Sequence, residues 1–133
     1  MAVYLLDANH ASPLVTLSHP LRSKFFAAVQ AGHRFAICVP VLSEVWYGIS
    51  LLPRATQNQA EWAKLKAWLP CHALDEADGD MAAELQLTLR RRGKQLETVD
   101  ALIAAVAIRY DLTLLTTDRD FLPLTHLKQE NWR

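Results

Sequence analysis

Two aspartates follow short apolar runs at widely separated places in the chain. Asp7 comes directly after residues 3–6, and Asp118 comes after residues 112–115 and two threonines. Such runs are typical of strands that are buried on both faces of a parallel sheet. In open α/β sheets, ligands bind at the carboxyl ends of the strands, in the crevice where the strand order reverses. If these two strands are neighbours there, both carboxylates face one pocket.

Two further acids are expected at the same edge of the sheet. Asp100 stands in the first turn of an otherwise apolar helix, and Glu44 lies just past a helix start that follows the second predicted strand. Carboxylates that converge without a basic partner repel one another, and their pKa values rise unless a cation neutralises them. Hard oxygen ligands suit Mg²⁺ or Mn²⁺. The sequence therefore predicts a divalent-cation site formed by Asp7, Glu44, Asp100 and Asp118.

Each of these acids also has a purely structural interpretation. Asp7 suits a turn after a strand, and Asp118 suits a turn or a helix cap. Asp100 complements the dipole of its helix, and Glu44 suits an exposed helical position. Asp120, two residues after Asp118, competes with it for the position of the fourth acid. The acids in combination indicate a metal site more strongly than any one of them.

Strands and helices alternate along the chain. Apolar runs predict strands at residues 3–6, 34–39, 71–74 and 112–115, and a last edge strand is expected at residues 126–129. Helical spacing and Pro or Gly boundaries predict helices at residues 21–31, 40–52, 58–69 and 75–92, and a further helix that Thr98 caps. Because the strands are continuously apolar, they indicate a parallel sheet that is covered on both faces. The predicted fold is a single α/β domain over residues 1–133.

Composition narrows the class of protein. The chain of 133 residues is 51% hydrophobic, and its 14 Lys and Arg balance 14 Asp and Glu, so no overall field attracts nucleic acid or an anionic membrane. The sequence contains neither a run long enough to span a membrane nor a secretory signal, which predicts a cytoplasmic protein. Cys38 and Cys71 lie in apolar stretches without metal-binding spacing, and both are expected to be reduced core residues.

Three segments resemble one known family. The segments LLDANHAS, VPVLSEVWYGI and TVDALIAAVAIRYDLTLLTTDRDF, in that order and at that spacing, are similar to PIN-domain ribonucleases. They most resemble the VapC-type toxins of bacterial and archaeal toxin–antitoxin pairs. The resemblance extends from about residue 3 to residue 121. It implies a three-layer α/β/α sandwich around a parallel sheet of about four or five strands.

The resemblance also assigns roles to individual residues. It implies that Asp7, Glu44, Asp100 and Asp118 are the catalytic acids that hold Mg²⁺ or Mn²⁺ for the hydrolysis of RNA. Asn9 and Thr116 match residues that orient the ligands or a water molecule. Ala8 departs from the family, which often has Thr or Ser there, but this change removes no ligand.

An RNA substrate must reach an acidic pocket on a chain of zero net charge. Arg90, Arg91, Arg92 and Lys94 form a dense basic run, and Arg119 follows Asp118 directly. These side chains can hold phosphates next to the cleaved bond, although the basic run also suits a helix C-terminus. His10 invites assignment as a catalytic base, but we expect a surface or packing role because a metal-activated water needs less help.

The resemblance implies two kinds of protein partner, a small antitoxin that covers the active site and a second copy in a homodimer. The segment between residues 46 and 68 carries more apolar side chains than one buried face needs, which suits a groove for an amphipathic helix, with core packing as the alternative. These residues are Trp46, Tyr47, Leu51, Leu52, Trp62 and Trp68. Two other functions remain open: a PIN-like nuclease of RNA maturation without an antitoxin, and a catalytically silent RNA-binding domain.

Overall fold

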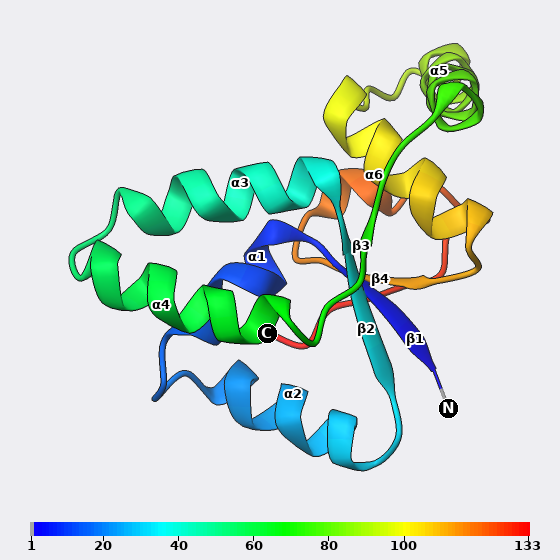
Figure 1. Ribbon diagram of the computed structural model, residues 1–133. Coiled ribbons are helices and arrows are strands. Elements are labelled where there is room, and N and C mark those ends of the chain that lie inside the picture. Colours follow the sequence, from blue (N-terminus) through cyan, green and yellow to red (C-terminus); the bar gives the residue numbers. More distant parts are fainter. Residues whose placement is uncertain (1) are drawn as a thin grey trace.

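The computed structural model describes residues 2–133. Five parallel strands form one sheet in the order β3-β2-β1-β4-β5 (Figure 1). The strands are β1 (Val3–Leu6), β2 (Arg34–Cys38), β3 (Cys71–His72), β4 (Thr113–Leu115) and β5 (Gln129–Glu130). The α-helices are α1 (Ala8–Ala11), α2 (Pro20–Gln30), α3 (Val39–Ser50), α4 (Ala55–Lys66), α5 (Glu76–Arg91) and α6 (Thr98–Arg109). Two 3₁₀-helices, η1 (Ser12–Val15) and η2 (Arg119–Phe121), complete the described elements.

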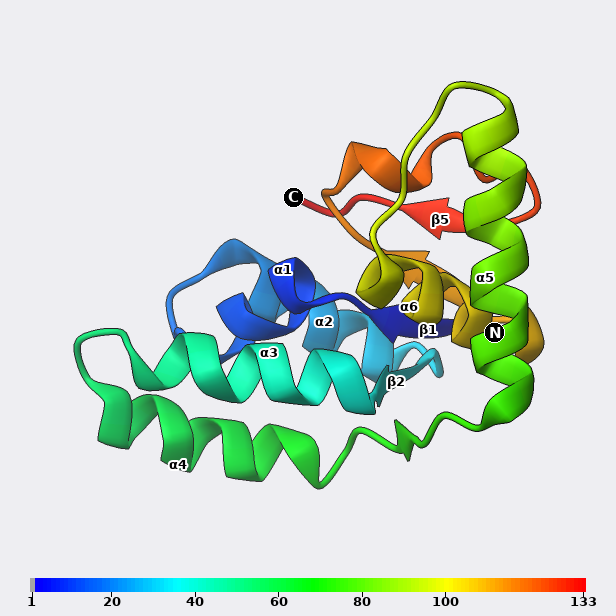
Figure 2. The ribbon, with the colours of Figure 1, turned by 90° about the horizontal axis from the view of Figure 1, so that it is seen from above.

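Helices lie on both sides of the sheet, as the sequence predicts. Helices α1 to α4 lie on one side, and α5 and α6 lie on the other (Figures 1 and 2). The connections from β1 to β2 and from β2 to β3 move in one direction across the sheet, whereas the connection from β3 to β4 crosses back. Because such crossovers are right-handed, a change of direction moves the connecting helices to the other face. The three-layer α/β fold is therefore confirmed.

The strand order reverses between β1 and β4. These strands are paired with Leu6 opposite Leu115, so their carboxyl ends stop side by side. The centre of the sheet is fully buried, and Leu5 and Leu114 have no exposed surface. Helix α6 buries nearly all of its apolar body because it lies between the sheet and α5. The two predicted strands that precede Asp7 and Asp118 are thus neighbours at the topological switch point.

The structure differs from the sequence analysis at α1 and at the last strand. A turn was the structural alternative for Asp7, but the chain enters α1 at once, because the Asp7 side chain accepts a hydrogen bond from the Ala8 amide and caps the helix. The last strand is β5 rather than residues 126–129, since the chain still turns where the Leu127 amide donates to the Leu124 carbonyl.

Boundaries and caps account for the other differences. Helix α4 begins and ends three residues earlier than predicted, after Arg54 adopts a left-handed φ of 64°. Thr98 is the first residue of α6 and not its cap, a position that Glu97 takes. Cys38 is buried as predicted, but Cys71 is exposed because β3 is a two-residue strand at the edge of the sheet. Asp75, by contrast, caps α5 in a capping box with Asp78.

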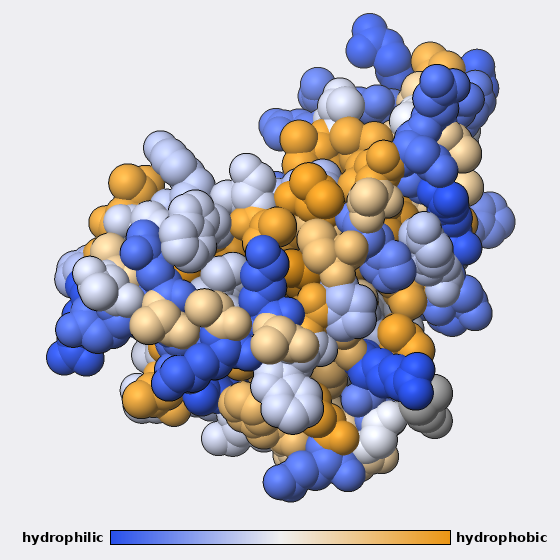
Figure 3. Space-filling view, viewed as in Figure 1, coloured by the Kyte–Doolittle hydropathy of each residue, from blue (hydrophilic) through white to orange (hydrophobic). Residues whose placement is uncertain are grey.

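No helix within residues 2–133 has the length and apolar character needed to cross a membrane. Figure 3 shows an apolar area in the middle of one face, over the region where α3 and α6 approach each other, with hydrophilic residues over α5. The exposed apolar side chains at the two helix starts are Val39 on α3 and Val99 on α6.

Candidate metal centre

Asp7 lies at the junction of β1 and α1, and its side chain is 5% exposed. The Asp7 amide donates to the Leu115 carbonyl across 3.0 Å, which extends the pairing of β1 with β4 by one residue and sets Asp7 beside Thr116. Oδ2 of Asp7 accepts from the Thr116 hydroxyl at 2.7 Å and from the Asn9 amide nitrogen at 3.2 Å. Oδ1 accepts from the Ala8 amide at 2.8 Å. The Asp7 carboxylate is therefore fixed from three directions.

Asn9 and Thr116 link the ends of β1 and β4. Nδ2 of Asn9 donates to the Thr116 hydroxyl oxygen at 3.2 Å, and Oδ1 of Asn9 accepts from the Thr117 amide at 3.0 Å. The Thr116 oxygen also accepts from the Asp118 amide at 3.0 Å. These contacts are those of side chains that orient neighbouring acids, the arrangement expected around a metal centre.

Asp100, Asp118 and Asp120 form an acidic cluster beyond Asp7. Each of them offers a carboxylate oxygen within 4.8 Å of the others. Asp118 is also the N-cap of η2, because its Oδ1 accepts from the Asp120 amide at 2.8 Å. Asp118 therefore both caps η2 and belongs to the acidic cluster, so its structural role does not exclude a role in metal binding. Asp118 is partly buried and Asp120 is exposed.

Electrostatics connects the cluster to Asp7 and Glu44. The pKa of Asp100 is raised to about 6, first by burial and then by the charges of Asp118, Asp7, Glu44 and Glu97 in that order. The pKa of Glu44 is also raised, first by burial and then by Asp7. The four acids that the sequence singled out therefore share one electrostatic environment, although they come from β1, α3, α6 and the end of β4.

No ion pair among the described residues compensates this charge. None of the ion pairs formed within residues 2–133 involves Asp7, Glu44, Asp100, Asp118 or Asp120. An ionised carboxylate has about four lone-pair sites, and the three donors around Asp7 leave about one of them free. Oxygen donors, converging negative charge and a preset carboxylate fit a hard divalent cation. These acidic residues could therefore hold a metal ion.

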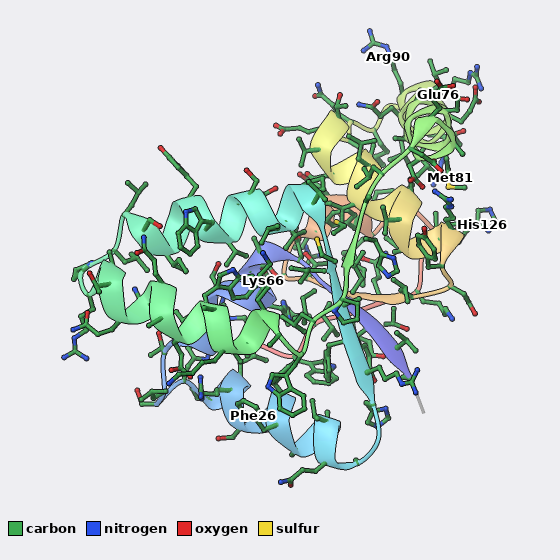
Figure 4. The ribbon with its side chains drawn as sticks, in the orientation of Figure 1. Phe26, Lys66, Glu76, Met81, Arg90 and His126 are labelled. Carbon is green, nitrogen blue, oxygen red and sulfur yellow. The ribbon has the colours of Figure 1, made fainter. Side chains whose placement is uncertain are left out.

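The basic residues lie in two different places. Arg119 and Asp118 both line a cavity of about 210 Å³ beside the ends of β4 and β5. The run at residues 90–92 is exposed at the end of α5, and Arg90 points away from the body of the molecule (Figure 4). Arg90 and Lys94 line a separate cavity of about 480 Å³. Of these five basic residues, Arg119 alone lines a cavity together with a member of the acidic cluster.

An apolar groove lies between α3 and α4, with a volume of about 800 Å³. We call it the α3–α4 groove; its lining residues are Leu42, Ser43, Trp46, Tyr47, Ser50, Trp62, Ala63 and Lys66. Of the side chains expected there, Trp46 and Tyr47 are exposed within the groove. Trp62 is 1% exposed and belongs to the core, so for this residue the core-packing alternative was right. Trp68 lies at another cavity, on the side of α2 and β2.

His10 has the packing role that we expected. It is fully buried, and burial, with a smaller contribution from Arg133, lowers its pKa to about 4. Its Nδ1 lies 2.7 Å from Oδ1 of Asn9, and its Nε2 accepts from the Trp132 amide at 3.0 Å. Sequence reasoning missed the contacts of Trp132 and Arg133 with this region, because no motif links residues that are more than 120 positions apart in the chain.

Fold and site together define an α/β domain with an acidic centre at the carboxyl edge of its sheet. The model of the PIN domain family matches residues 4–126, and the chain therefore belongs to this family. Ribonuclease VapC2 of Rickettsia felis is 26% identical over 131 residues, which are 98% of each chain.

Solved structures of similar chains share this fold. VapBC2 from Rickettsia felis, bound to a DNA fragment from its promoter, superposes with a TM-score of 0.84 at 26% identity and covers 98% of this chain and 99% of the other. DNA-bound VapBC from Salmonella typhimurium has a TM-score of 0.82 at 21% identity, with both chains fully covered. VapBC-1 from nontypeable Haemophilus influenzae has a TM-score of 0.78 at 20% identity, with 98% of each chain covered.

Proposed function

We propose that this protein is a metal-dependent endoribonuclease and the toxin of a toxin–antitoxin pair. The observation that carries the proposal is the uncompensated group of carboxylates at the switch point of the sheet. A relative that is named a ribonuclease and matches over almost the full length supports the same activity. RNA is then the substrate, and its phosphodiester bond is hydrolysed at this centre.

We propose that Asp7, Glu44, Asp100 and Asp118 hold the metal, with Mg²⁺ or Mn²⁺ as the ion that oxygen ligands favour. Asp118 is a better candidate than Asp120 for the fourth acid, because it is more buried and acts on the pKa of Asp100. A bound divalent cation would supply Lewis-acid activation of water and of the phosphoryl group.

The residues of the chain supply the positioning in this proposal. Thr116 and Asn9 hold Oδ2 of Asp7, and the same Thr116 oxygen fixes the backbone at Asp118. The Asp7 carboxylate and the backbone at Asp118 are thus set in place before any ion binds, which reduces the reorganisation needed during the reaction. Arg119 is placed to bind a phosphate next to the cleaved bond, and Arg90, Arg91, Arg92 and Lys94 would bind phosphates farther along the RNA.

The antitoxin is the second proposed partner. The similar structure of VapBC-5 from Mycobacterium tuberculosis is named a member of the VapBC family of toxin-antitoxin systems, and we propose that this chain binds an antitoxin as well. The α3–α4 groove suits an amphipathic helix, because Trp46 and Tyr47 present apolar surface at its wall and Lys66 offers a positive charge. A homodimer and a cytoplasmic location complete the proposal; light scattering of the purified protein tests the dimer.

Cleavage of a mixed cellular RNA pool tests the function. Purified protein without antitoxin should cut RNA in Mg²⁺ or Mn²⁺ and not in EDTA, and both Asp7→Asn and Asp100→Asn should lose this activity. Glu84→Gln, which neutralises an exposed acid on α5, is the matched control and should cut like the wild type. Folded wild-type protein that binds RNA without cutting it would favour the catalytically silent domain.

A further inference from the structure

A chain of hydrogen bonds joins the segment after β5 to the acidic centre. The Trp132 amide donates to Nε2 of His10 at 3.0 Å, and the other ring nitrogen of His10 lies 2.7 Å from Oδ1 of Asn9. The amide nitrogen of Asn9 then donates to Oδ2 of Asp7 at 3.2 Å. This series of hydrogen bonds therefore passes through the buried imidazole of His10 and ends at the carboxylate of Asp7.

The direction of every bond in this chain is fixed by backbone donors at its two ends. The Thr117 amide donates to Oδ1 of Asn9, which settles which end of the Asn9 side chain is the oxygen. The Trp132 amide donates to Nε2 of His10, so this nitrogen carries no proton. Since Oδ1 of Asn9 can only accept, Nδ1 of His10 must carry the proton and donate it. His10 is thus a neutral imidazole in a single tautomer.

Residues 131–133, which we call the clamp segment, are held firmly against the domain. The Trp132 ring packs edge-on against Tyr4 at 5.0 Å and Phe35 at 5.8 Å between ring centroids. Lys24 donates to the Trp132 carbonyl at 3.1 Å. The Arg133 guanidinium donates to the Asn9 carbonyl at 2.9 Å. The clamp segment thus contacts both the core and the turn that carries Asn9.

The small cavity beside His10 offers a water molecule few polar partners with which to take over the role of the imidazole. The cavity next to its ring has a volume of about 10 Å³, and its other lining side chains are apolar, Trp132 apart. A buried water needs about 10 to 15 Å³ and two or more polar partners. If the Nδ1 donor is lost, Oδ1 of Asn9 keeps only the Thr117 amide as a partner.

We propose that His10 is a positioning residue through which the clamp segment holds Asn9, and with it Asp7, in the geometry that binds the metal. The inference rests on the proposed function of the acidic centre. It assigns to the residues after β5 a role in metal binding, although they lie on the far side of His10 from the acids.

Two substitutions of His10 separate positioning from simple packing. In His10→Asn the amide nitrogen can replace Nδ1 and donate to Asn9, but nothing accepts from the Trp132 amide. In His10→Gln the longer side chain can replace Nε2 and accept from Trp132, but the donor to Asn9 is lost. His126→Gln is the matched control, because His126 is exposed at the edge of the molecule beyond α6 (Figure 4).

Mn²⁺ binding measured by calorimetry is the main readout. His10→Gln should weaken Mn²⁺ binding about tenfold, the usual effect of losing a residue that orients a metal ligand, whereas His10→Asn should stay within about threefold of the wild type. His10→Asn should nevertheless be the less stable of the two in thermal unfolding, because it leaves a void and an unpaired amide. In cleavage assays, His10→Gln should need more Mn²⁺ for half-maximal rate at an unchanged KM for RNA.

A second pair of variants tests the Trp132 amide itself. Trp132→Ala removes the ring but keeps the backbone donor, whereas Trp132→Pro removes both. Mn²⁺ binding should therefore weaken more in Trp132→Pro than in Trp132→Ala. In ¹⁵N spectra of the metal-free wild type at neutral pH, His10 should show the tautomer that is protonated at Nδ1.

The results that overturn the inference differ from those that overturn the proposed function. Wild-type binding of Mn²⁺ by His10→Gln, equal losses in His10→Gln and His10→Asn, or an Nε2-protonated ring would overturn the role of His10 alone. A wild-type protein that binds no Mn²⁺ would overturn the metal centre itself, and the inference with it.

Discussion

Replacing Asp100 with asparagine should stabilise the metal-free protein at neutral pH while it abolishes metal binding. Burial and four neighbouring carboxylates raise the pKa of Asp100 from 3.8 to about 6. A shift of that size corresponds to about 3 kcal/mol of unfavourable free energy when the carboxylate is ionised. Asparagine has nearly the same shape as aspartate and carries no charge. Within residues 2–133, the Asp100 side chain makes no hydrogen bond or ion pair. The substitution therefore relieves the repulsion without breaking such a contact.

Two effects reduce the expected gain. Because Asp100 is only partly buried, screening by solvent lowers the 3 kcal/mol to about 1.5 kcal/mol. Asp100 also stands in the first turn of α6, where its charge interacts favourably with the helix dipole by about 0.5 kcal/mol. Subtracting the lost helix-dipole interaction from the relieved repulsion leaves about 1 kcal/mol. The free energy of unfolding of Asp100→Asn should therefore exceed that of the wild type by about 1 kcal/mol at pH 7.5.

The sign of the pH dependence follows from proton binding. The folded state binds the Asp100 proton more tightly than the unfolded state, so this residue costs stability as pH rises from about 4 to about 6, and the cost is complete above that range. Since asparagine does not titrate, the advantage of the variant should be fully present at pH 7.5, fall to about a third at pH 4.5 and vanish only below the unfolded pKa of 3.8.

Urea unfolding in EDTA at the two pH values measures these differences. Glu84→Gln is again the control for the loss of one negative charge, and it should match the wild type at both pH values. Saturating Mn²⁺ should stabilise the wild type and not Asp100→Asn, because an ion that binds only the folded state raises stability by mass action. An Asp100→Asn protein that is no more stable than the wild type at pH 7.5 would refute the account of repulsion at this centre.

Three further predictions concern the surface and the thiols. Changing the three arginines at residues 90–92 to glutamine should weaken RNA binding. The slope of the logarithm of the binding constant against the logarithm of the salt concentration should decrease by the equivalent of up to about three phosphate contacts. An unchanged slope would show that these arginines do not contact the RNA. Trp46→Ala should fold normally, since this side chain is half exposed, but should bind the co-expressed antitoxin about 30-fold or more weakly in pull-down titrations; unchanged binding would place the antitoxin outside the α3–α4 groove. In the native protein, Cys71 should react with a thiol reagent and Cys38 should not, because burial raises the pKa of Cys38 to about 12; two reactive thiols before unfolding would contradict this burial.

Sequence periodicity was enough to predict the parallel α/β architecture. Residues 3–6 are continuously apolar and residues 112–115 are interrupted only by Thr113, a pattern typical of strands that are buried on both faces of a covered sheet. Short or weakly patterned elements were predicted less well. Helix α1 was missed because its single turn is stabilised by the cap that Asp7 provides, and a four-residue segment shows no periodicity.

The sequence by itself determined which acids are available and that each follows a strand or opens a helix, because these are local properties of the chain. Only the tertiary structure decided that Asp7 and Asp118 are joined through Thr116, since the pairing of β1 with β4 brings together residues 109 positions apart. The tertiary structure also decided the role of His10, which depends on a backbone amide 122 residues away. Contacts of this kind arise from the order in which strands pair, and the periodicity of a single sequence carries no information about that order.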